Sequence, residues 1–384
     1  PAQHDWRRAC GLGNFGGVCG LSTDRRGHLD SGIRFGWRRF LGVFRNGRLE
    51  CCFTHLGSQN LRILDGIVDE RMVASKLNFF LIGAPKAGTT LIHSRLSEHA
   101  QVYLSPLKEP NHFATDIDPA GFSPAFKANL PGQLDRYFGQ KPLKSRQVGF
   151  VSDLNQYATL FDQATPQHKV VGECSTSYLW STEAAENVAQ AHPQAKILVA
   201  LRNPLDRLFS HWQMARKYGF TDAPLLEAVR DDQAHPNPGW GKSELFVEAG
   251  QYASGLRRWQ ARFPEANIKV VLNASLNDPA TWQGLADWLG LDGPIPGGKN
   301  IPANPAGMAR MPGLNHWVTQ SGIKATAARV LPSGFKKKLA SRWYTTKGLP
   351  KMSQEERAAL WPFFEQDIKE TESLTGLDLS HWQV

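Results

Sequence analysis

Short apolar runs recur along the chain and predict a set of buried strands. The first, Leu77 to Ile82, is broken only by Asn78; it is long enough for one strand and too short for a helix to be favoured. Similar runs follow at residues 102–104, 169–173, 196–201 and 268–272. The run KILVAL at 196–201 is typical of a strand that is buried on both faces in a parallel sheet.

Between these runs, apolar residues recur at helical spacing. The spacing predicts an amphipathic helix over Ser243–Phe263 and a last helix that Ser353 caps and that runs to about Thr371. Strands and helices alternate, and no internal repeat interrupts the alternation. The pattern therefore predicts an α/β fold, a single three-layer domain with a central parallel sheet and helices on both faces.

A polar loop, GAPKAGTT at residues 83–90, joins the first predicted strand to a helix. Such a loop points backbone N–H groups and the positive end of the helix dipole at one spot, where a phosphate fits. Lys86 adds a positive charge, and Thr89 and Thr90 add hydroxyl donors. The loop is P-loop-like but not a Walker A loop, because Thr89 stands where that motif has its lysine. An ordinary strand-to-helix turn with a stray lysine is the alternative interpretation.

A second stretch, RNPLDRLFSHW at residues 202–212, follows the KILVAL strand. Asn203 and Pro204 have the residue types of a helix cap and first helical position. Ser210 lies about two helical turns after Arg202, so the two side chains can converge on one phosphate. Taken alone, the stretch also fits a helix with ordinary surface charges.

The loop SPLKEPNHF, which begins at residue 105, follows another predicted strand. Pro110 disfavours helical geometry at Glu109. Loops that follow parallel strands line the ligand crevice, so Glu109 is a candidate site residue. Most single glutamates are solvated surface residues, which is the alternative here.

Residues 1–71 differ from the rest of the chain. They carry 11 arginines, no lysine and four of the five cysteines, without a sustained apolar period. The first methionine is Met72. We expect residues 1–71 to be upstream sequence that is not native to the protein, and residues 72–384 to form the functional domain. A basic arm that binds something acidic is the alternative.

Composition excludes several classes of protein. Among 384 residues, 41% are hydrophobic, which suffices for a packed core, and no apolar run approaches the length of a membrane span. The start does not resemble a signal peptide, and the five cysteines show neither zinc-ligand spacing nor a disulfide framework. We therefore expect a cytoplasmic protein without a membrane span or a bound metal.

The two phosphate-binding stretches together resemble the sulfotransferases that use 3′-phosphoadenosine 5′-phosphosulfate (PAPS). In that family a loop similar to Pro85–Thr90 cradles the 5′-phosphosulfate, and an Arg and a Ser that match Arg202 and Ser210 hold the 3′-phosphate. The resemblance covers about residues 76–384. It implies that the donor-binding residues are Lys86, Ala87, Gly88, Thr89, Thr90, Arg202 and Ser210.

The resemblance is strongest to the branch of bacterial and heparan sulfate glucosaminyl sulfotransferases. In that branch a Lys-Glu-Pro loop carries the catalytic glutamate, which matches Glu109, and a Gly-Glu-x-Ser-x-x-Tyr-Leu turn matches Gly172–Leu179. Asn111 and Cys174 depart from the branch, which often has a histidine and a lysine there. In the loop that closes over the 3′-phosphate, residues 300–312 here, Arg310 is the one cation, and the resemblance makes it a further donor-binding residue.

The resemblance implies PAPS as co-substrate, adenosine 3′,5′-bisphosphate as product, and no metal. The acceptor would be a hydroxyl or amine of a glycan or small molecule. Glu109 would be the base, with His112 as second candidate, and Lys86 would neutralise charge on the leaving group.

Two other functions fit parts of the sequence. A P-loop kinase or NTPase would need a lysine at position 89 and an acidic magnesium ligand. A binding module without catalysis would use the net charge of +9 and the basic run 336–338. We expect no nucleic-acid partner, because the aromatic interleaving of RNA-binding segments is missing, and nothing indicates an oligomeric state.

Overall fold

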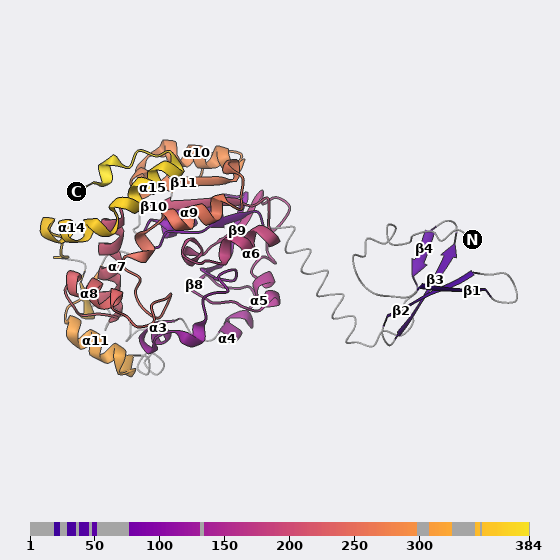
Figure 1. Cartoon of the computed structure of the whole chain (residues 1–384), viewed down its shortest axis with the longest axis horizontal. Helices are drawn as coiled ribbons and strands as arrows, with labels where there is room; N and C mark the ends of the chain where they lie inside the picture. Colours follow the sequence, from indigo (N-terminus) through magenta and orange to yellow (C-terminus); the bar gives the residue numbers. More distant parts are fainter. Residues whose placement is uncertain are drawn as a thin grey trace. The chain divides into compact units, whose positions relative to one another are not determined.

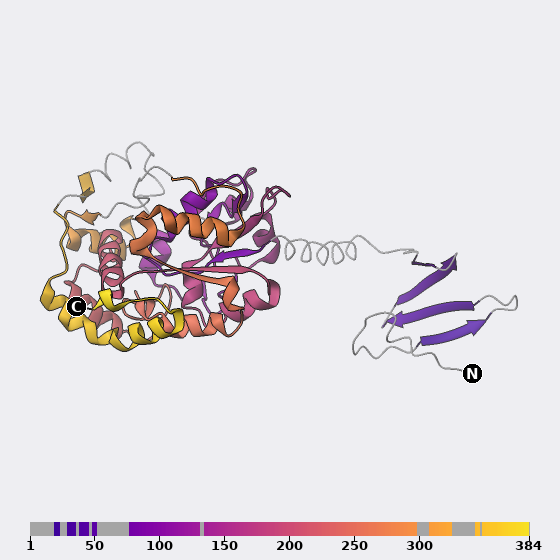
Figure 2. The ribbon, with the colours of Figure 1, turned by 90° about the horizontal axis from the view of Figure 1, so that it is seen from above.

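The computed structural model describes two compact units, Pro1–Val68 and Asp69–Val384. In the first it describes the backbone of four strands. In the second it describes residues 77–130, 134–297, 307–324, 342–345 and 348–383. Figures 1 and 2 show the ribbon of both units.

The four strands of the first unit form an antiparallel sheet in sequence order. They are β1 (Cys19–Thr23), β2 (Leu29–Phe35), β3 (Arg38–Arg45) and β4 (Arg48–Cys51). Apolar periodicity did not predict these strands. That residues 1–71 are not native stays a prediction, as does a domain boundary at Met72.

A five-stranded parallel sheet forms the centre of the second unit, in the order β11-β10-β5-β9-β6. Its strands are β5 (Phe79–Leu81), β6 (Val102–Leu104), β9 (Val170–Cys174), β10 (Lys196–Leu201) and β11 (Ile268–Leu272). Strands β9 and β5 approach so closely that a Cβ at Gly172 would lie 2.0 Å from the Phe79 carbonyl oxygen. The predicted α/β fold with a central parallel sheet is confirmed.

Helices cover both faces of this sheet, and Figure 2 shows α10 in orange and α15 in yellow on opposite sides of the strands. On one side, the Arg95 guanidinium lies 4.4 Å from the ring centroid of Trp282 and joins α2 to α10. On the other, an ion pair from Arg257 links α9 to α15, and one from Arg262, just after α9, reaches Glu186 on α6. These helices are α2 (Thr89–Ser97), α6 (Ala184–Ala191), α9 (Ala253–Gln260), α10 (Pro279–Leu289) and α15 (Glu365–Thr375).

Further helices and two short sheets complete the second unit. The helices are α3 (Pro124–Asn129), α4 (Leu134–Phe138), α5 (Leu154–Thr159), α7 (Pro204–Tyr218), α8 (Leu225–Gln233), α11 (Pro312–Gln320) and α14 (Gln354–Leu360). Two short parallel strands, β7 (Leu107–Lys108) and β8 (Arg146–Gln147), pair with each other, and β12 (Met308–Ala309) pairs with β13 (Tyr344–Thr345) in antiparallel fashion.

The predicted helix over Ser243–Phe263 is wrong in extent, because only residues 248–250, as a 3₁₀ turn, and α9 are helical. Asp232 draws the first part out of helical geometry by accepting from the backbone N–H groups of residues 244–246. Asp367 accepts from the N–H groups of Tyr252 and Ala253 and so sets where α9 begins. Both carboxylates lie outside the segment, Asp232 before it and Asp367 far after it in sequence.

The predicted last helix begins where expected and is then interrupted. Ser353 caps α14 through a capping box with Glu356. A 3₁₀ turn, Trp361–Phe363, follows before α15 starts, because Pro362 cannot donate the backbone hydrogen bond that a continuous helix needs.

Candidate active site

The turn between β5 and α2 is held in place from the end of β11, the edge strand on the far side of β10. Gly88 has a φ of +98°, and a Cβ there would lie 2.6 Å from Leu276 Cδ1, so glycine is required. Asn273, just after β11, donates from Nδ2 to the Ala87 carbonyl at 3.1 Å. The turn is thereby fixed at the carboxyl edge of the sheet.

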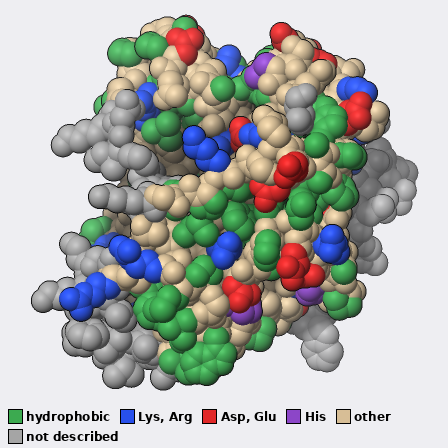
Figure 3. All heavy atoms as spheres, turned by 90° about the vertical axis from the view of Figure 1, so that its left-hand side faces the viewer, with side chains coloured by type: hydrophobic (Ala, Val, Ile, Leu, Met, Phe, Trp, Pro, Cys, Tyr) green, Lys and Arg blue, Asp and Glu red, His purple; other side chains and the backbone are tan. Residues whose placement is uncertain are grey.

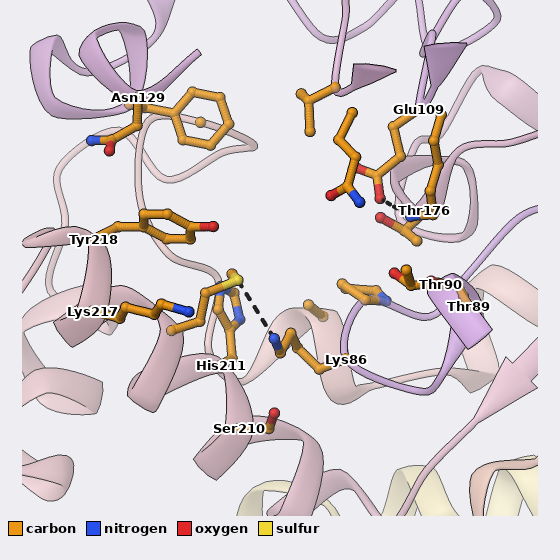
Figure 4. Close-up of a pocket in the computed structure, with 18 of the residues that line it drawn as sticks. Lys86, Thr89, Thr90, Glu109, Asn129, Thr176, Ser210, His211, Lys217 and Tyr218 are labelled. Carbon is orange, nitrogen blue, oxygen red and sulfur yellow. Dashed lines mark hydrogen bonds and ion pairs between the residues drawn. The ribbon is translucent and has the colours of Figure 1, made fainter. Parts of the chain in front are cut away.

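Lys86 stands inside this turn with a φ of 68°. Its Nζ lies 3.6 Å from Sδ of Met214 on α7, and its side chain extends into the cleft that Figure 4 shows. Thr89 and Thr90, at the start of α2, line the same cleft. A lysine and a helix N-terminus that face one space suit an anionic ligand.

The second predicted stretch meets the first at the end of β10. Arg202 donates from Nη1 to the Lys86 carbonyl at 3.3 Å. Asn203 caps α7 by accepting from the N–H of Leu205 at 3.0 Å, as predicted. The cleft-facing side of α7 then carries Ser210, so Arg202 and Ser210 line one space with Lys86.

Glu109 reaches the cleft from the loop after β7. Its φ is 62°, a left-handed conformation rather than the extended one expected before a proline. Its backbone N–H donates to the Cys174 carbonyl at 2.7 Å. Its side chain is 18% exposed and pairs through Oε1 with Nζ of buried Lys108 at 2.7 Å. Oε2 is thus the oxygen that this ion pair leaves available.

These residues line a cleft of about 1120 Å³. The wall opposite Lys86 and Glu109 carries Asn129 and Tyr218, as Figure 4 shows. Phe126 and Phe220 belong to the same wall, and their ring centroids are 6.1 Å apart. The cleft therefore has a cationic side, which carries Lys86 and Arg202, and an aromatic side, where Lys217 also lies beside Tyr218.

The charge in the cleft is positive around Lys86. Burial, together with the positive charges of Arg202, Lys217 and Arg207, lowers the pKa of Lys86 to about 8, while Glu109 opposes the shift. Binding an anion would relieve this repulsion. The site is thus electrostatically prepared for a multiply charged anion.

A series of three interacting polar side chains next to the cleft, Arg207, His211 and Glu244, was not predicted from the sequence. Arg207 is completely buried, and its Nη1 lies 3.2 Å from His211 Nδ1. Because arginine can only donate, Nδ1 accepts and the imidazole proton sits on Nε2, 3.5 Å from Glu244 Oε2. Burial lowers the pKa of His211 well below its usual range and, with Asp232, raises the pKa of Glu244 to about 8. No motif marks Glu244, which only the fold brings to the cleft.

A model of the sulfotransferase family matches residues 78–291, more than half of the chain. The chain belongs to the sulfotransferase family.

Its similarity to known sulfotransferases is distant. Rat carbohydrate sulfotransferase 15 is 25% identical over 154 residues, which cover 35% of this chain and 26% of that protein. Human bifunctional heparan sulfate N-deacetylase/N-sulfotransferase 3 is 27% identical over 207 residues, 53% of this chain and 21% of that protein. The chain therefore spans only a small part of these relatives.

Among solved structures, a sulfotransferase from Alicyclobacillus acidocaldarius has a similar fold. It is 24% identical, covers 80% of this chain and 98% of its own, and superposes with a TM-score of 0.52. This likeness supports the fold alone.

In this sulfotransferase chain, the predicted residues that line the common cleft are Lys86, Gly88, Thr89, Thr90, Glu109, Arg202 and Ser210. The side chain of Ala87, in the same loop, is buried and does not line the cleft. Arg310 is exposed and is not among the lining residues, and its predicted role in donor binding gains no support from the geometry. Residues 300–306 of the predicted closing loop lie outside the described residues.

His112 is also not among the residues that line the cleft. Its Nδ1 lies 2.7 Å from the Val151 carbonyl oxygen, and its ring stacks on Tyr157 with centroids 4.1 Å apart. Burial lowers its pKa. The packing favours Glu109 over His112 as the residue that faces a ligand.

The described residues include neither a membrane-spanning helix nor a metal-binding cluster. No helix among them is both long enough and apolar enough to cross a membrane. In the same part of the chain, no three His, Cys, Asp or Glu side chains are grouped so that they could hold a metal ion.

Proposed function

We propose that this chain transfers the sulfuryl group of PAPS to a hydroxyl or amine of an acceptor. The observation that carries the proposal is the meeting of two phosphate-binding stretches, where Arg202 donates to the Lys86 carbonyl, in a cleft that Glu109 also lines. Membership of the sulfotransferase family supports the reaction class.

The donor would bind along the cationic side of the cleft. Lys86 and the N-terminus of α2 are suited to the 5′-phosphosulfate. Arg202 and Ser210, at the end of β10 and two turns into α7, are suited to the 3′-phosphate. Ala87 would take part only through the backbone of the loop.

The reaction needs little covalent chemistry from the protein. The acceptor oxygen or nitrogen forms a bond to sulfur while the bond from sulfur to the bridging oxygen of the donor breaks. The acceptor proton passes to Glu109, through Oε2, because Lys108 holds Oε1 at 2.7 Å. Lys86 offsets the negative charge that develops on the bridging oxygen. The products are the sulfated acceptor and adenosine 3′,5′-bisphosphate.

The acceptor would lie against the aromatic side of the cleft. Phe126, Tyr218 and Phe220 present rings on which a sugar or another flat ring can pack. The names of the rat and human relatives refer to carbohydrate and heparan sulfate. We therefore propose a glycan or a ring-bearing small molecule as acceptor. We also propose that the protein acts in the cytoplasm.

Two alternative functions have less support. A kinase or NTPase of the P-loop type lacks its lysine, because Thr89 stands at that position. The second alternative is a basic binding module. On the face of the molecule that Figure 3 shows, Lys and Arg side chains lie in small groups among acidic and hydrophobic ones. The basic run 336–338 lies outside the described residues.

Donor binding can be measured by titration calorimetry with adenosine 3′,5′-bisphosphate. Arg202→Ala should weaken binding by about 2–5 kcal/mol, which is roughly 30-fold or more, because a charge-assisted contact to phosphate is lost. Arg257→Ala is a matched control, since Arg257 pairs with Glu370 on the surface, away from the lining residues of the cleft.

Equal affinity in the wild type and Arg202→Ala would contradict the 3′-phosphate assignment. Tighter binding of ATP with magnesium than of adenosine 3′,5′-bisphosphate would favour the kinase or NTPase alternative.

A further inference from the structure

Glu173 is a completely buried carboxyl on β9 that the proposed reaction does not use. Three hydroxyl groups surround it: Ser175 Oγ at 2.5 Å, Tyr178 Oη at 2.7 Å and Tyr157 Oη at 2.8 Å. A buried carboxylate is costly unless such donors satisfy it. Here all three donors are present, so the carboxylate can be kept ionised inside the protein.

Two of the three hydroxyls connect Glu173 to the loop that carries Glu109. Ser175 Oγ accepts from the backbone N–H of Asn111 at 3.0 Å. Tyr178 Oη accepts from the backbone N–H of Phe113 at 3.1 Å. Because each hydroxyl proton is directed at Glu173, each oxygen keeps a lone pair free for the loop.

The loop needs such support, since its backbone is strained on both sides of Pro110. Glu109 and Asn111 have φ values of 62° and 53°, and such conformations cost on the order of 1–3 kcal/mol each in non-glycine residues. Asn111 strengthens the link, because its Nδ2 donates to the Glu109 carbonyl at 2.8 Å. Ser175 thus holds the backbone of Asn111, and the Asn111 side chain in turn holds the backbone of Glu109.

We propose that Glu173 is a positioning residue that holds the Glu109 loop in its reactive conformation through Ser175 and Tyr178. This inference rests on the proposed function, in which Glu109 accepts the acceptor proton. Glu173 acts only through the loop and does not line the cleft.

Two tyrosines offer a matched pair of test variants. Tyr157 and Tyr178 are both buried and both donate to Glu173 Oε1, but only Tyr178 also accepts from the loop. Tyr157→Phe and Tyr178→Phe each remove one hydroxyl from the same carboxylate. They differ in whether the link to the loop is lost, and each leaves the aromatic ring and the Glu173 carboxylate in place.

The experiment compares both variants with wild type in single-turnover sulfation of one identified acceptor. It is done at pH 8, above the value of about 7 to which burial raises the pKa of Glu173, so that the carboxylate is ionised. Donor affinity and Tm are measured in parallel. We expect similar losses of Tm, unchanged donor affinity, a rate within about twofold of wild type for Tyr157→Phe, and a rate roughly 10- to 100-fold lower for Tyr178→Phe.

Equal rates in the two variants would overturn the positioning role, as would a rate that merely follows the loss of Tm. If wild type binds the donor but transfers no sulfuryl group to any acceptor, the proposed function itself has failed and the inference with it. A selective loss of rate in Tyr178→Phe supports both.

Discussion

Replacing Lys86 with alanine should slow sulfuryl transfer by about 10³-fold, because it removes the one cation within the β5–α2 turn from the point where the leaving group becomes charged. Lys86 Nζ is held near Met214 Sδ rather than by a carboxylate, so its charge is available to a donor. The single-turnover rate at saturating PAPS measures the effect separately from donor binding.

The pH dependence offers an independent check on Lys86. A pKa lowered to about 8 means that the ammonium of the free enzyme loses its proton as the pH rises through about 8. The kcat/KM for PAPS should therefore fall above that pH. Arginine keeps its charge in this pH range, so the kcat/KM of the Lys86→Arg variant should not fall above pH 8, whatever its absolute rate. A Lys86→Ala rate within a few-fold of wild type would contradict the assigned role.

Glu109→Gln should slow transfer by roughly 10²–10⁴-fold while donor affinity changes little. Glutamine keeps the size of the side chain and can still contact Lys108, but it cannot accept a proton. The measurement is single-turnover sulfation of one identified acceptor, with donor affinity determined by calorimetry on the same protein.

His112→Ala is the control for this prediction. Its ring stacks on Tyr157 and contacts the Val151 carbonyl, so we expect its loss to reduce stability more than rate. If Glu109→Gln transfers almost as fast as wild type and His112→Ala does not, His112 is the base and the assignment of Glu109 is wrong.

Much of the fold was predictable because the signals are local. The apolar runs at 77–82 and 196–201 became β5 and β10, and Asn203 caps α7 as its residue type indicated. Parallel sheets bind ligands at the carboxyl ends of their strands, so the loops that carry Lys86, Glu109 and Arg202 could be predicted to meet at one cleft.

What could not be predicted depends on contacts between distant residues. Asn273 steadies the Lys86 loop from 186 positions away along the chain, through the Ala87 carbonyl. Glu244 and Asp232 meet only because the backbone after residue 243 folds around the Asp232 carboxylate. The strands β1–β4 were missed because their residues show no sustained alternation, which is the pattern that predicts a half-buried strand.

The central claim, that this cleft moves a sulfuryl group from PAPS, is tested most directly by following the sulfur. Wild-type protein, Lys86→Ala and Glu109→Gln are each incubated with sulfur-labelled PAPS and a panel of glycans and ring-bearing alcohols and amines, and the products are read by mass spectrometry. The account predicts a labelled acceptor and an equal amount of adenosine 3′,5′-bisphosphate with wild type, and strongly reduced amounts of both with the two variants. Equal labelling by all three proteins, or nucleotide release without a labelled acceptor across the panel, would contradict it.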